Sequence, residues 1–481
     1  MTGGAVSGNF DGKKEACGIF GILGTSDASY ITHFGLQALQ HRGEEAAGIA
    51  STDGRQIHLH AAEGHVREVF QSEATLAGLK GFAAIGHTRY SITGAPCAVN
   101  VQPLVVDLVK GRIAVAHNGN LTNSVELKEE LEKNGSIFQS SIDTELVLHL
   151  IAKSKKENIK DAIIEALLRL EGSYALVILT NDTLYAARDA KGFKPLCLGD
   201  LGGVKVVASE TSAFDLVGAT YTGQVLPGEL VTITRGGVER EIFAPKAKQT
   251  SCIFELIYFA RPDSLVFDES VYNFRKELGR VLAREAPADA DIVVPVPDSG
   301  VNAALGFAEA TGIPYEPAII RNHYVGRSFI QPSEKLREAA VRIKLNPIKH
   351  LIQGKRVVIV DDSVVRGTTT RERVRSLRAA GAKEVHMRVS CPPIKHGCYY
   401  GIDFPDEKKL IANLMNVADT AKYLNLDSLA YISLDGMIKA ASGVNGFCDA
   451  CFTGNYPTRV DKAFSKDALE RSPQLELTPA N

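Results

Sequence analysis

The sequence predicts two domains, an α+β first half with antiparallel sheets and an α/β second half with a parallel sheet. The chain has 481 residues, 45% of them hydrophobic, which is enough for two or more cores. Up to about residue 245, short β-rich segments such as GFAAIGH, RIAVAHNG and YALVILT recur between turn signals and helical patterns. After about residue 270, the strands DIVVPVP and KRVVIVDDS alternate with helices, which indicates βαβ crossovers.

Composition excludes several classes of protein. Lys and Arg number 54 against 56 Asp and Glu, a net charge of −2, so no basic field attracts nucleic acid. No apolar run reaches the roughly 18 to 20 residues of a membrane helix, and the first 16 residues lack the apolar stretch of a secretory signal. We therefore expect a cytoplasmic protein with no membrane or nucleic-acid partner. Eight cysteines are too few for a disulfide framework and favour catalytic or metal-binding thiols.

The segment VVIVDDSVVRGTTT (357–370) carries the clearest chemistry. Four β-branched residues predict a buried strand, which ends in two carboxylates, a small hydroxyl-rich loop and a helix. The loop and the helix N-terminus suit one phosphate, whereas Asp361 and Asp362 suit neighbouring hydroxyls. A sugar 5-phosphate with a free 2,3-diol fits this pattern. The plain alternative is a strand end with capping acids.

The same segment resembles the phosphoribosyl-pyrophosphate (PRPP) motif of type I phosphoribosyltransferases, which have a Rossmann-like fold. The resemblance implies ribose binding by the two aspartates, 5-phosphate binding by the following loop, and a pyrophosphate loop at PVPDSG (295–300). It implies Mg²⁺ at Ser299, Asp361 and Asp362. Residues 321–347, with Tyr324, Gly326 and Pro332, resemble a mobile flap, although a solvated basic loop is the alternative. The implied PRPP-binding residues are Asp361, Asp362, Ser363, Val364, Val365, Arg366, Gly367, Thr368, Thr369, Asp298, Ser299 and Gly300.

Cys17 lies where a polar, Gly-rich leader meets the apolar run CGIFGILG. Removal of residues 1–16 would give Cys17 a free α-amine with a pKa of about 7.7 to 8.0, able to act as base for its own thiol. An isolated cysteine at a strand start is more often an ordinary buried thiol.

The surrounding motifs favour the catalytic interpretation. CGIFGILG, LQALQHRGEEAAGI, GHTRYSITG, HNGNLTN and SIDTE resemble the N-terminal-nucleophile glutamine amidotransferases, which have an αββα fold. The resemblance implies that Arg89 and Asp143 bind the amino-acid end of glutamine, that Asn118 and Gly119 form an oxyanion hole, and that Arg42 orders the loop around Cys17. Two residues depart from the family pattern: Glu44 replaces an expected Gln, and Lys194 an expected Arg.

The two halves in this order resemble the glutamine-dependent amidotransferases that act on PRPP. The resemblance implies that ammonia from glutamine passes internally to C1 of PRPP, giving phosphoribosylamine, glutamate and pyrophosphate in purine synthesis. It also implies feedback inhibition by purine nucleotides and a homotetramer. We expect a propeptide at 1–16, a glutaminase domain at 17–250, a phosphoribosyltransferase domain at 251–460 and a tail at 461–481.

Cys448 and Cys451 form a C-x₂-C pair, and Cys252 and Cys391 are distant single cysteines. Four such thiolates suit zinc or an iron–sulfur cluster, and packing cysteines are the alternative. The CDACFTG segment resembles the cluster-bearing branch of the family, which implies a structural [4Fe–4S] centre on these four residues. Cys97, Cys197 and Cys398 are left as packing residues.

Other functions share parts of this pattern. Glucosamine-6-phosphate synthase has a similar glutaminase half but no PRPP loop, and asparagine synthetase needs an SGGxDS-type loop that this sequence lacks. A non-catalytic PRPP sensor would have no use for Cys17, Arg89, Asn118 and Asp143 together.

Overall fold

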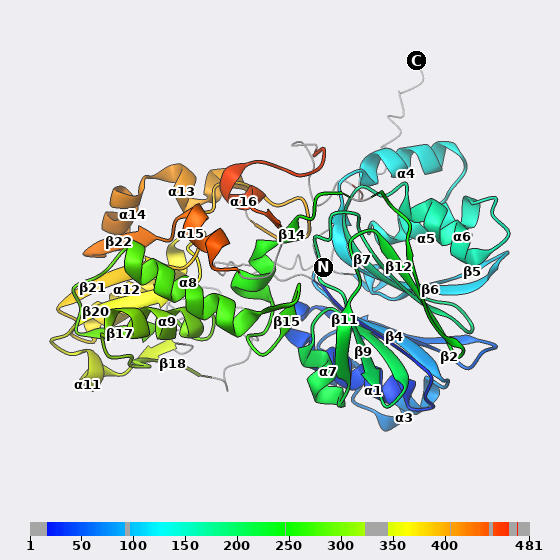
Figure 1. The fold of residues 1–481 in the computed structure, drawn as a ribbon, viewed down its shortest axis with the longest axis horizontal. Coiled ribbons are helices and arrows are strands. Elements are labelled where there is room, and N and C mark those ends of the chain that lie inside the picture. Colours follow the sequence, from blue (N-terminus) through cyan, green and yellow to red (C-terminus); the bar gives the residue numbers. More distant parts are fainter. Residues whose placement is uncertain are drawn as a thin grey trace, which may run out of the picture.

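The computed structural model describes residues 17–91, 97–245, 247–322, 345–404, 406–441, 446–460 and 469, which form two lobes (Figure 1). The first half of the chain forms the lobe on the right of the view, and the second half forms the lobe on the left. The predicted leader, most of the predicted flap and nearly all of the predicted tail lie outside the described residues. The predicted domain boundaries therefore stay predictions.

Two antiparallel sheets form the centre of the first lobe. One has the order β11-β9-β10-β1-β4-β2-β3 and the other the order β13-β12-β8-β7-β6-β5. The strands of the first sheet are β1 (Gly18–Leu23), β2 (Ala46–Thr52), β3 (Ile57–Glu63), β4 (Ala83–Arg89), β9 (Cys197–Leu201), β10 (Val204–Ala208) and β11 (Thr220–Gln224). Those of the second are β5 (Leu104–Leu108), β6 (Gly111–Leu121), β7 (Gly172–Leu179), β8 (Leu184–Arg188), β12 (Glu229–Thr234) and β13 (Gly237–Ile242).

The sheets pack face to face, and helices cover their outer faces. In β6, Ala114 and Ala116 face the other sheet, whereas Ile113 and Val115 face the helices, which is the two-residue alternation of a strand buried on both sides. The result is an αββα sandwich, as the sequence predicts. The helices of this lobe are α1 (Ala28–Ala38), η1 (Gln40–Arg42), α2 (Val66–Val69), α3 (Glu73–Gly78), η2 (Ala98–Asn100), α4 (Ser124–Lys133), α5 (Thr144–Lys153), α6 (Ile159–Leu167) and α7 (Ser212–Val217).

A four-stranded parallel sheet forms the centre of the second lobe, with the order β17-β20-β21-β22. Val357, Val358, Ile359 and Val360 of β20 are all fully buried, in agreement with the predicted strand. The sheet strands are β17 (Ile292–Pro295), β20 (Arg356–Asp361), β21 (Glu384–Val389) and β22 (Ser428–Tyr431). Two short hairpins accompany them: β15 (Leu265–Val266) with β16 (Glu269–Ser270), and β18 (Ile319–Arg321) with β19 (Leu345–Pro347).

Helices pack against this sheet, with α8 on α9, α9 on β17 and β20, α12 on β21 and α14 on β22. None of the helices in the described part of the chain is both long and apolar enough to cross a membrane. The helices are η3 (Glu255–Phe259), α8 (Val271–Glu285), α9 (Val301–Thr311), α11 (Lys349–Ile352), α12 (Thr368–Ala379), η4 (Glu407–Lys409), α13 (Ile411–Leu414), α14 (Val417–Tyr423), α15 (Leu434–Lys439) and α16 (Ala450–Thr453).

The C-terminal segment returns to the junction of the two lobes. Strand β23 (Phe447–Cys448) pairs in parallel with β14 (Ser251–Cys252), and the register places Cys252 beside Cys448. Asn120 of β6 donates a hydrogen bond from Nδ2 to the carbonyl of Tyr399, at 2.9 Å. The segment around the cysteines therefore contacts the first lobe directly.

His87 of β4 lies between the two sheets of the first lobe. It is fully buried, its Nε2 lies 3.1 Å from the carbonyl oxygen of His117 on β6, and its Nδ1 has no hydrogen-bond partner in the structure. Burial, with the nearby positive charge of Arg89, lowers the pKa of His87 to about 3. The imidazole is therefore neutral in the folded protein at pH 7.

We predict that His87 makes the protein less stable in mild acid. Below about pH 6.5 the unfolded chain takes up a proton on His87 that the folded chain does not bind until about pH 3, so stability falls across this window by up to about 1.4 kcal/mol per pH unit. Urea unfolding of His87→Gln at several pH values between 4 and 7 should show a shallower loss. His350→Gln, at an exposed position, should keep the original slope; equal slopes in all three proteins would contradict the prediction.

Candidate active sites

A small pocket in the first lobe collects most of the predicted glutaminase residues. It opens between the start of β1, the end of β4, β6 and the start of α5, and its volume of about 20 Å³ holds roughly one water molecule. Glutamine therefore enters only when part of the wall moves. The lining residues are Cys17, Arg89, Tyr90, Gln102, His117, Gly119, Ile142 and Asp143.

The thiol of Cys17 is buried at the edge of this pocket. Its Sγ donates a hydrogen bond to the carbonyl oxygen of Tyr90, at 3.4 Å. Burial raises the pKa of Cys17 above its usual value, although the charge of Arg89 acts in the opposite direction. The thiol is therefore protonated at neutral pH and needs a base before it can act as a nucleophile.

Asn118 and Gly119 lie side by side on β6. The side chain of Asn118 is fully buried, and among the described residues neither Nδ2 nor Oδ1 has a hydrogen-bond partner. A buried amide without a partner is costly in a folded protein, and it is suited to donate to a charge that develops during a reaction. Gly119 has φ +153°, and a Cβ there would lie 2.0 Å from the Ser173 carbonyl oxygen, so only glycine fits.

Asp143, at the start of α5, is held in place before any ligand binds. Its Oδ2 accepts a hydrogen bond from the Leu121 amide at 2.9 Å, and its Oδ1 lies 3.3 Å from Nδ1 of His117. Gln102 accepts a hydrogen bond from the His117 amide at 2.8 Å. No sequence motif pointed to Gln102 or Tyr90 as pocket residues. His117 is the first residue of the HNGN motif, and its position there could have indicated that it lies in the pocket.

A second cavity, of about 430 Å³, lies at the carboxyl edge of the parallel sheet in the second lobe. This is where ligands bind in open α/β sheets, because the loops after neighbouring strands converge there. The lining includes seven of the residues predicted to bind PRPP: Asp298, Ser299, Asp361, Asp362, Ser363, Val365 and Thr369. The remaining lining residues are His41, Tyr258, Phe259, Ala260, Arg261, Pro262, Val296, Pro297, Arg321, Thr370 and Arg373.

The carboxylates of Asp361, the last residue of β20, and of Asp362 are buried, and both accept hydrogen bonds. Asp361 accepts a hydrogen bond from Arg373 at 2.9 Å and one from the Asp362 amide at 2.9 Å. Asp362 accepts one from the Ser363 hydroxyl at 2.8 Å. Arg321 forms an ion pair with Asp298 at the other side of the cavity. The cavity thus holds acidic and basic groups in defined places.

Five of the predicted PRPP residues do not line the cavity: Gly300, Val364, Arg366, Gly367 and Thr368. Val364 is buried in the hydrophobic core. Gly300 has a packing reason to be glycine, because a Cβ there would lie 2.3 Å from the Val360 carbonyl oxygen. A sequence motif therefore includes residues that shape the loop as well as residues that face its ligand.

Both lobes contribute to the wall of the larger cavity. His41 comes from η1 of the first lobe, and residues 258–262 form the end of η3 and the turn after it, at the start of the second lobe. The sequence analysis missed these residues, because the apolar string IYFARP carries no recognisable binding motif. Only the folded chain brings them beside Asp361.

A cluster of buried charges lies between the two cavities. Arg42, Lys194, Glu210 and Glu255 all have fully buried side chains, two positive and two negative. Arg42 donates to the Cys17 carbonyl oxygen at 3.1 Å, to both oxygens of Glu255 at 2.9 and 2.8 Å, and to Glu210. Burial alone would raise the pKa of Glu210, but the charges of His41 and Arg42 outweigh it and hold the pKa well below its usual value.

The two departures from the family pattern lie in different surroundings. Lys194 keeps the positive charge expected of Arg and pairs with Glu255 at 3.0 Å. Glu44 is half-buried and lines neither cavity. Neither residue touches the thiol of Cys17 in a contact that the structure describes.

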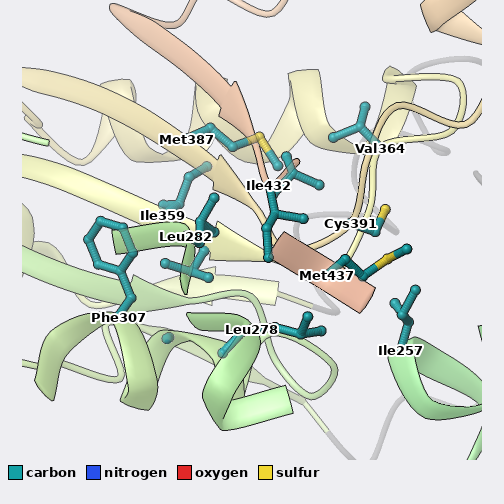
Figure 2. Close-up of a cluster of buried hydrophobic side chains, with 14 of the residues drawn as sticks. Ile257, Leu278, Leu282, Phe307, Ile359, Val364, Met387, Cys391, Ile432 and Met437 are labelled. Atoms are coloured by element: carbon teal, nitrogen blue, oxygen red, sulfur yellow. The ribbon is translucent and has the colours of Figure 1, made fainter. Parts of the chain in front are cut away.

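The predicted cluster cysteines are all buried, but the structure favours a different fourth member. Cys252, Cys398, Cys448 and Cys451 interact electrostatically in all six pairs, and Cys391 interacts with Cys451. Cys398 also packs against Cys448. Figure 2 shows Cys391 in the hydrophobic core near Val364, Ile432 and Met437, and its Sγ donates a hydrogen bond to the Pro392 carbonyl oxygen at 3.2 Å. The mutual interactions of the other four thiols therefore favour Cys398 over Cys391 as the fourth member.

Comparison with known proteins agrees with this two-site arrangement. Residues 87–216 match the model of a glutamine amidotransferase domain, and residues 276–410 match that of a phosphoribosyl transferase domain. The chain is 48% identical to the amidophosphoribosyltransferase of Bacillus subtilis over 455 residues, 93% of this chain and 95% of the relative. It is also 48% identical to the enzyme of that name from Synechocystis, over 95% of this chain and 94% of the relative.

Solved structures show the same likeness over both lobes. One is the B. subtilis glutamine PRPP amidotransferase complexed with ADP and GMP, with a TM-score of 0.89 and 47% identity over 94% of this chain and all of that chain. Another, described as the allosteric regulatory enzyme of purine biosynthesis, has a TM-score of 0.90 and 47% identity over 95% of this chain and 99% of that chain. With this degree of identity along nearly the whole length, the chain belongs to the amidophosphoribosyltransferase family.

Proposed function

We propose that this chain makes 5-phosphoribosylamine, glutamate and pyrophosphate from glutamine, PRPP and water, the first step of purine synthesis, with each lobe catalysing one half of the reaction. The observation that carries this proposal is the pair of cavities, one around a buried thiol and the other around Asp361 and Asp362, joined by one cluster of buried charges. A protein with either cavity alone would perform only one half-reaction.

In the first half-reaction, the α-amine of residue 17, once freed, takes the thiol proton, and Sγ attacks the amide carbon of glutamine. The arrangement of Arg89 and Asp143 in one pocket supports binding of the carboxylate and ammonium of glutamine. The charge that develops on the amide oxygen receives hydrogen bonds from the Asn118 side chain and the Gly119 amide. Loss of NH₃ leaves a thioester on Cys17, which water then hydrolyses to glutamate.

In the second half-reaction, NH₃ attacks C1 of PRPP and pyrophosphate leaves. Asp361 and Asp362, at the end of β20, suit the ribose hydroxyls, and the position of Ser363, Val365 and Thr369 in the same cavity wall supports binding of the 5-phosphate. The guanidinium groups of Arg321 and Arg373 and the hydroxyl of Ser299 are hydrogen-bond donors in the same cavity, and the two arginines would bring positive charge to the pyrophosphate. Positive charge there favours departure of the pyrophosphate, because its negative charge increases as the bond breaks.

Mg²⁺ fits this cavity as a companion of PRPP. In the described part of the chain, no set of three or more His, Cys, Asp or Glu side chains is arranged to hold a metal ion unaided. Ser299, Asp361 and Asp362 are the protein groups that would contact it, with phosphate oxygens and water completing its shell. When bound, Mg²⁺ neutralises charge on the leaving pyrophosphate.

The thiols of Cys252, Cys398, Cys448 and Cys451 fit a [4Fe–4S] cluster. They are four cysteines with no histidine among them, and they interact electrostatically with one another at the junction of the lobes. A cluster bound there would fasten the C-terminal segment to both lobes. It would have a structural role, since nothing described nearby offers an electron partner.

Three other expectations from the sequence stay predictions: a homotetramer, feedback inhibition by purine nucleotides, and a cytoplasmic location. The B. subtilis relative was solved with ADP and GMP, which supports nucleotide binding in the family.

Cys17→Ala should abolish glutamine-dependent synthesis of phosphoribosylamine and leave synthesis from ammonium salts within about twofold of the native rate. The substitution removes the nucleophile, whereas the Asp361 cavity keeps its residues. Both rates are measured by pyrophosphate release at saturating PRPP and Mg²⁺. If a folded Cys17→Ala protein loses both syntheses, the proposal that each lobe catalyses a separate half-reaction is wrong.

The active protein should lack residues 1–16, because the proposed base is the α-amine of Cys17. Intact-mass analysis of the purified protein measures this directly, with Cys17→Ala as the comparison. Full glutamine-dependent activity in protein that keeps the leader would rule out the free amine as base.

Cys398→Ser should lose iron and acid-labile sulfide, whereas Cys391→Ser should keep both at native content. The two variants are a matched pair, since each replaces one cysteine near the same junction and Cys398 interacts with all three other proposed ligands. The content is measured per chain on protein purified without oxygen. The reverse result would restore Cys391 to the ligand set, and iron-free native protein would end the cluster proposal.

A further inference from the structure

The amide groups along one edge of β6 have different partners. Gly119 of β6 lies opposite Tyr174 of β7, and the carbonyl oxygen of Tyr174 accepts a hydrogen bond from the Asp189 amide at 2.9 Å. Tyr174 and Gly119 therefore exchange no hydrogen bonds, because bonded and non-bonded pairs alternate along an antiparallel ladder. The N–H of Gly119 points away from β7, toward the pocket of Cys17, which Gly119 lines.

The amides of His117 and Leu121, two residues before and after Gly119, point the same way, since backbone groups alternate between the two edges of a strand. His117 donates to Oε1 of Gln102 at 2.8 Å, and Leu121 donates to Oδ2 of Asp143 at 2.9 Å. Two side chains thus take the amides on either side of Gly119 and leave the middle one facing the pocket. A donor held in this way suits an oxyanion, because it needs no rearrangement when the charge develops.

The chain before β5 explains why no strand covers this edge. If β5 continued in its register with β6, Asn100 would lie opposite Gly119. The pairing stops after Pro103, which has no N–H to donate. Asn100 instead bonds Ser141 with its side chain, accepting from the amide at 3.0 Å and donating to the hydroxyl at 2.9 Å. The edge of β6 beside Gly119 therefore stays open to the pocket.

Gln102 is itself held firmly. It is buried and lines the pocket, and its backbone packs closely against β2, where a Cβ on Gly48 would lie 2.3 Å from the Gln102 carbonyl oxygen. The side-chain oxygen therefore meets the His117 N–H at a fixed place. Because Asn118 and Gly119 directly follow His117, this one bond anchors the segment that carries both proposed oxyanion donors.

We propose that Gln102 is a positioning residue of the glutaminase site: its side-chain oxygen replaces a strand carbonyl on the amide of His117, so that the amide of Gly119 stays free to donate to the oxyanion. This inference rests on the proposed function, since it takes glutamine to be the ligand of the pocket and Cys17 the nucleophile. Gln102 takes no part in proton transfer. Its contribution arises as charge develops on the amide oxygen of glutamine, so it acts on kcat more than on KM.

Gln102→Met tests this role, because methionine keeps the length of the side chain and removes the acceptor oxygen. The His117 amide then loses its partner, and the segment with Asn118 and Gly119 can shift. Loss of one oxyanion donor lowers kcat by about 10²- to 10³-fold, and a displaced donor should have a smaller effect. We expect kcat for glutamate release, with saturating PRPP and Mg²⁺, to fall by about 10- to 100-fold, with KM for glutamine within about threefold of the native value. A native kcat in folded Gln102→Met would overturn the inference.

Alkylation of Cys17 by iodoacetamide separates loss of the oxyanion donors from general damage to the site. In this reaction Sγ displaces iodide from carbon and no oxyanion forms, so the rate depends on the thiol. Measured from the mass of the Cys17 peptide, the rate in Gln102→Met should stay within about twofold of native. A fall in alkylation as large as the fall in glutamine hydrolysis would show that the thiol itself was disturbed, and would also overturn the inference.

Asn123→Leu is the matched control. The Oδ1 of Asn123 also accepts a main-chain hydrogen bond, from the Glu171 amide at 3.1 Å, but in the turn after β6 and outside the pocket. Leucine has a similar shape and removes the acceptor. The variant should keep the native kcat for glutamate release. A loss as large as that in Gln102→Met would mean that any weakening of β6 slows hydrolysis, and the specific role of Gln102 would be wrong.

Gln102→Asn decides the matter if Gln102→Met does not fold. It keeps the amide but withdraws its oxygen by one carbon–carbon bond from the His117 N–H, so kcat should fall at least about threefold while alkylation of Cys17 stays native. An unchanged kcat would count against the inference.

Glutamate release by the native protein separates this inference from the proposed function. If the native protein releases glutamate and both Gln102 variants do so equally fast, the proposed function stands and the inference falls. If the native protein releases no glutamate from glutamine with PRPP and Mg²⁺ present, the proposed function is refuted, and the inference with it.

Discussion

The two lobes depend on one buried arginine. Arg42 brings a positive charge into the interior, where an unpaired charge is very costly, and its side chain is satisfied by the Cys17 carbonyl and the carboxylates of Glu210 and Glu255. Lys194 balances the second carboxylate, so the four charges cancel. Because the partners come from both lobes, neither lobe can shift without breaking contacts that water cannot replace. This constraint fixes the two cavities relative to each other.

The parallel sheet determines where the second cavity lies. Its strands end at one edge, and the loops after β17 and β20 meet there with Asp298, Ser299, Asp361 and Asp362. The antiparallel sheets of the first lobe work differently. Adjacent strands β1, β4 and β2 bring Cys17 and Arg89 together through their register, while Gly119 and Asp143 approach from the second sheet and α5. In both lobes the chemistry lies at strand ends, where backbone groups are free to turn toward a ligand.

The cysteines at the junction show which members of a proposed ligand set can be predicted from sequence spacing and which cannot. The C-x₂-C pair is visible in the chain, and the pairing of β14 with β23 brings Cys252 to it. The choice between Cys391 and Cys398 depends on which of the two sulfurs lies near the other thiols at the junction of the lobes. Both are single cysteines a few residues apart, so spacing cannot separate them. The tertiary structure favours Cys398, because it packs against Cys448 and interacts electrostatically with Cys252, Cys448 and Cys451.

Local patterns in the chain were sufficient for the strand of β-branched residues before Asp361, for antiparallel sheets in the first half and for a parallel sheet in the second, because alternation and turn chemistry are properties of short segments. The αββα arrangement and the predicted residues of both sites came instead from the resemblance of the motifs to known families. Neither source predicted residues 258–262 in the wall of the larger cavity, the partners of Arg42 or the place of His41. Glu210 is 168 residues from Arg42 and Glu255 is 213 residues from it. Such pairs carry no local signal, since a buried ion pair needs only opposite charges at one point in space. Tertiary structure alone decided them, because only the packed interior makes an unmatched charge costly enough to fix its partner.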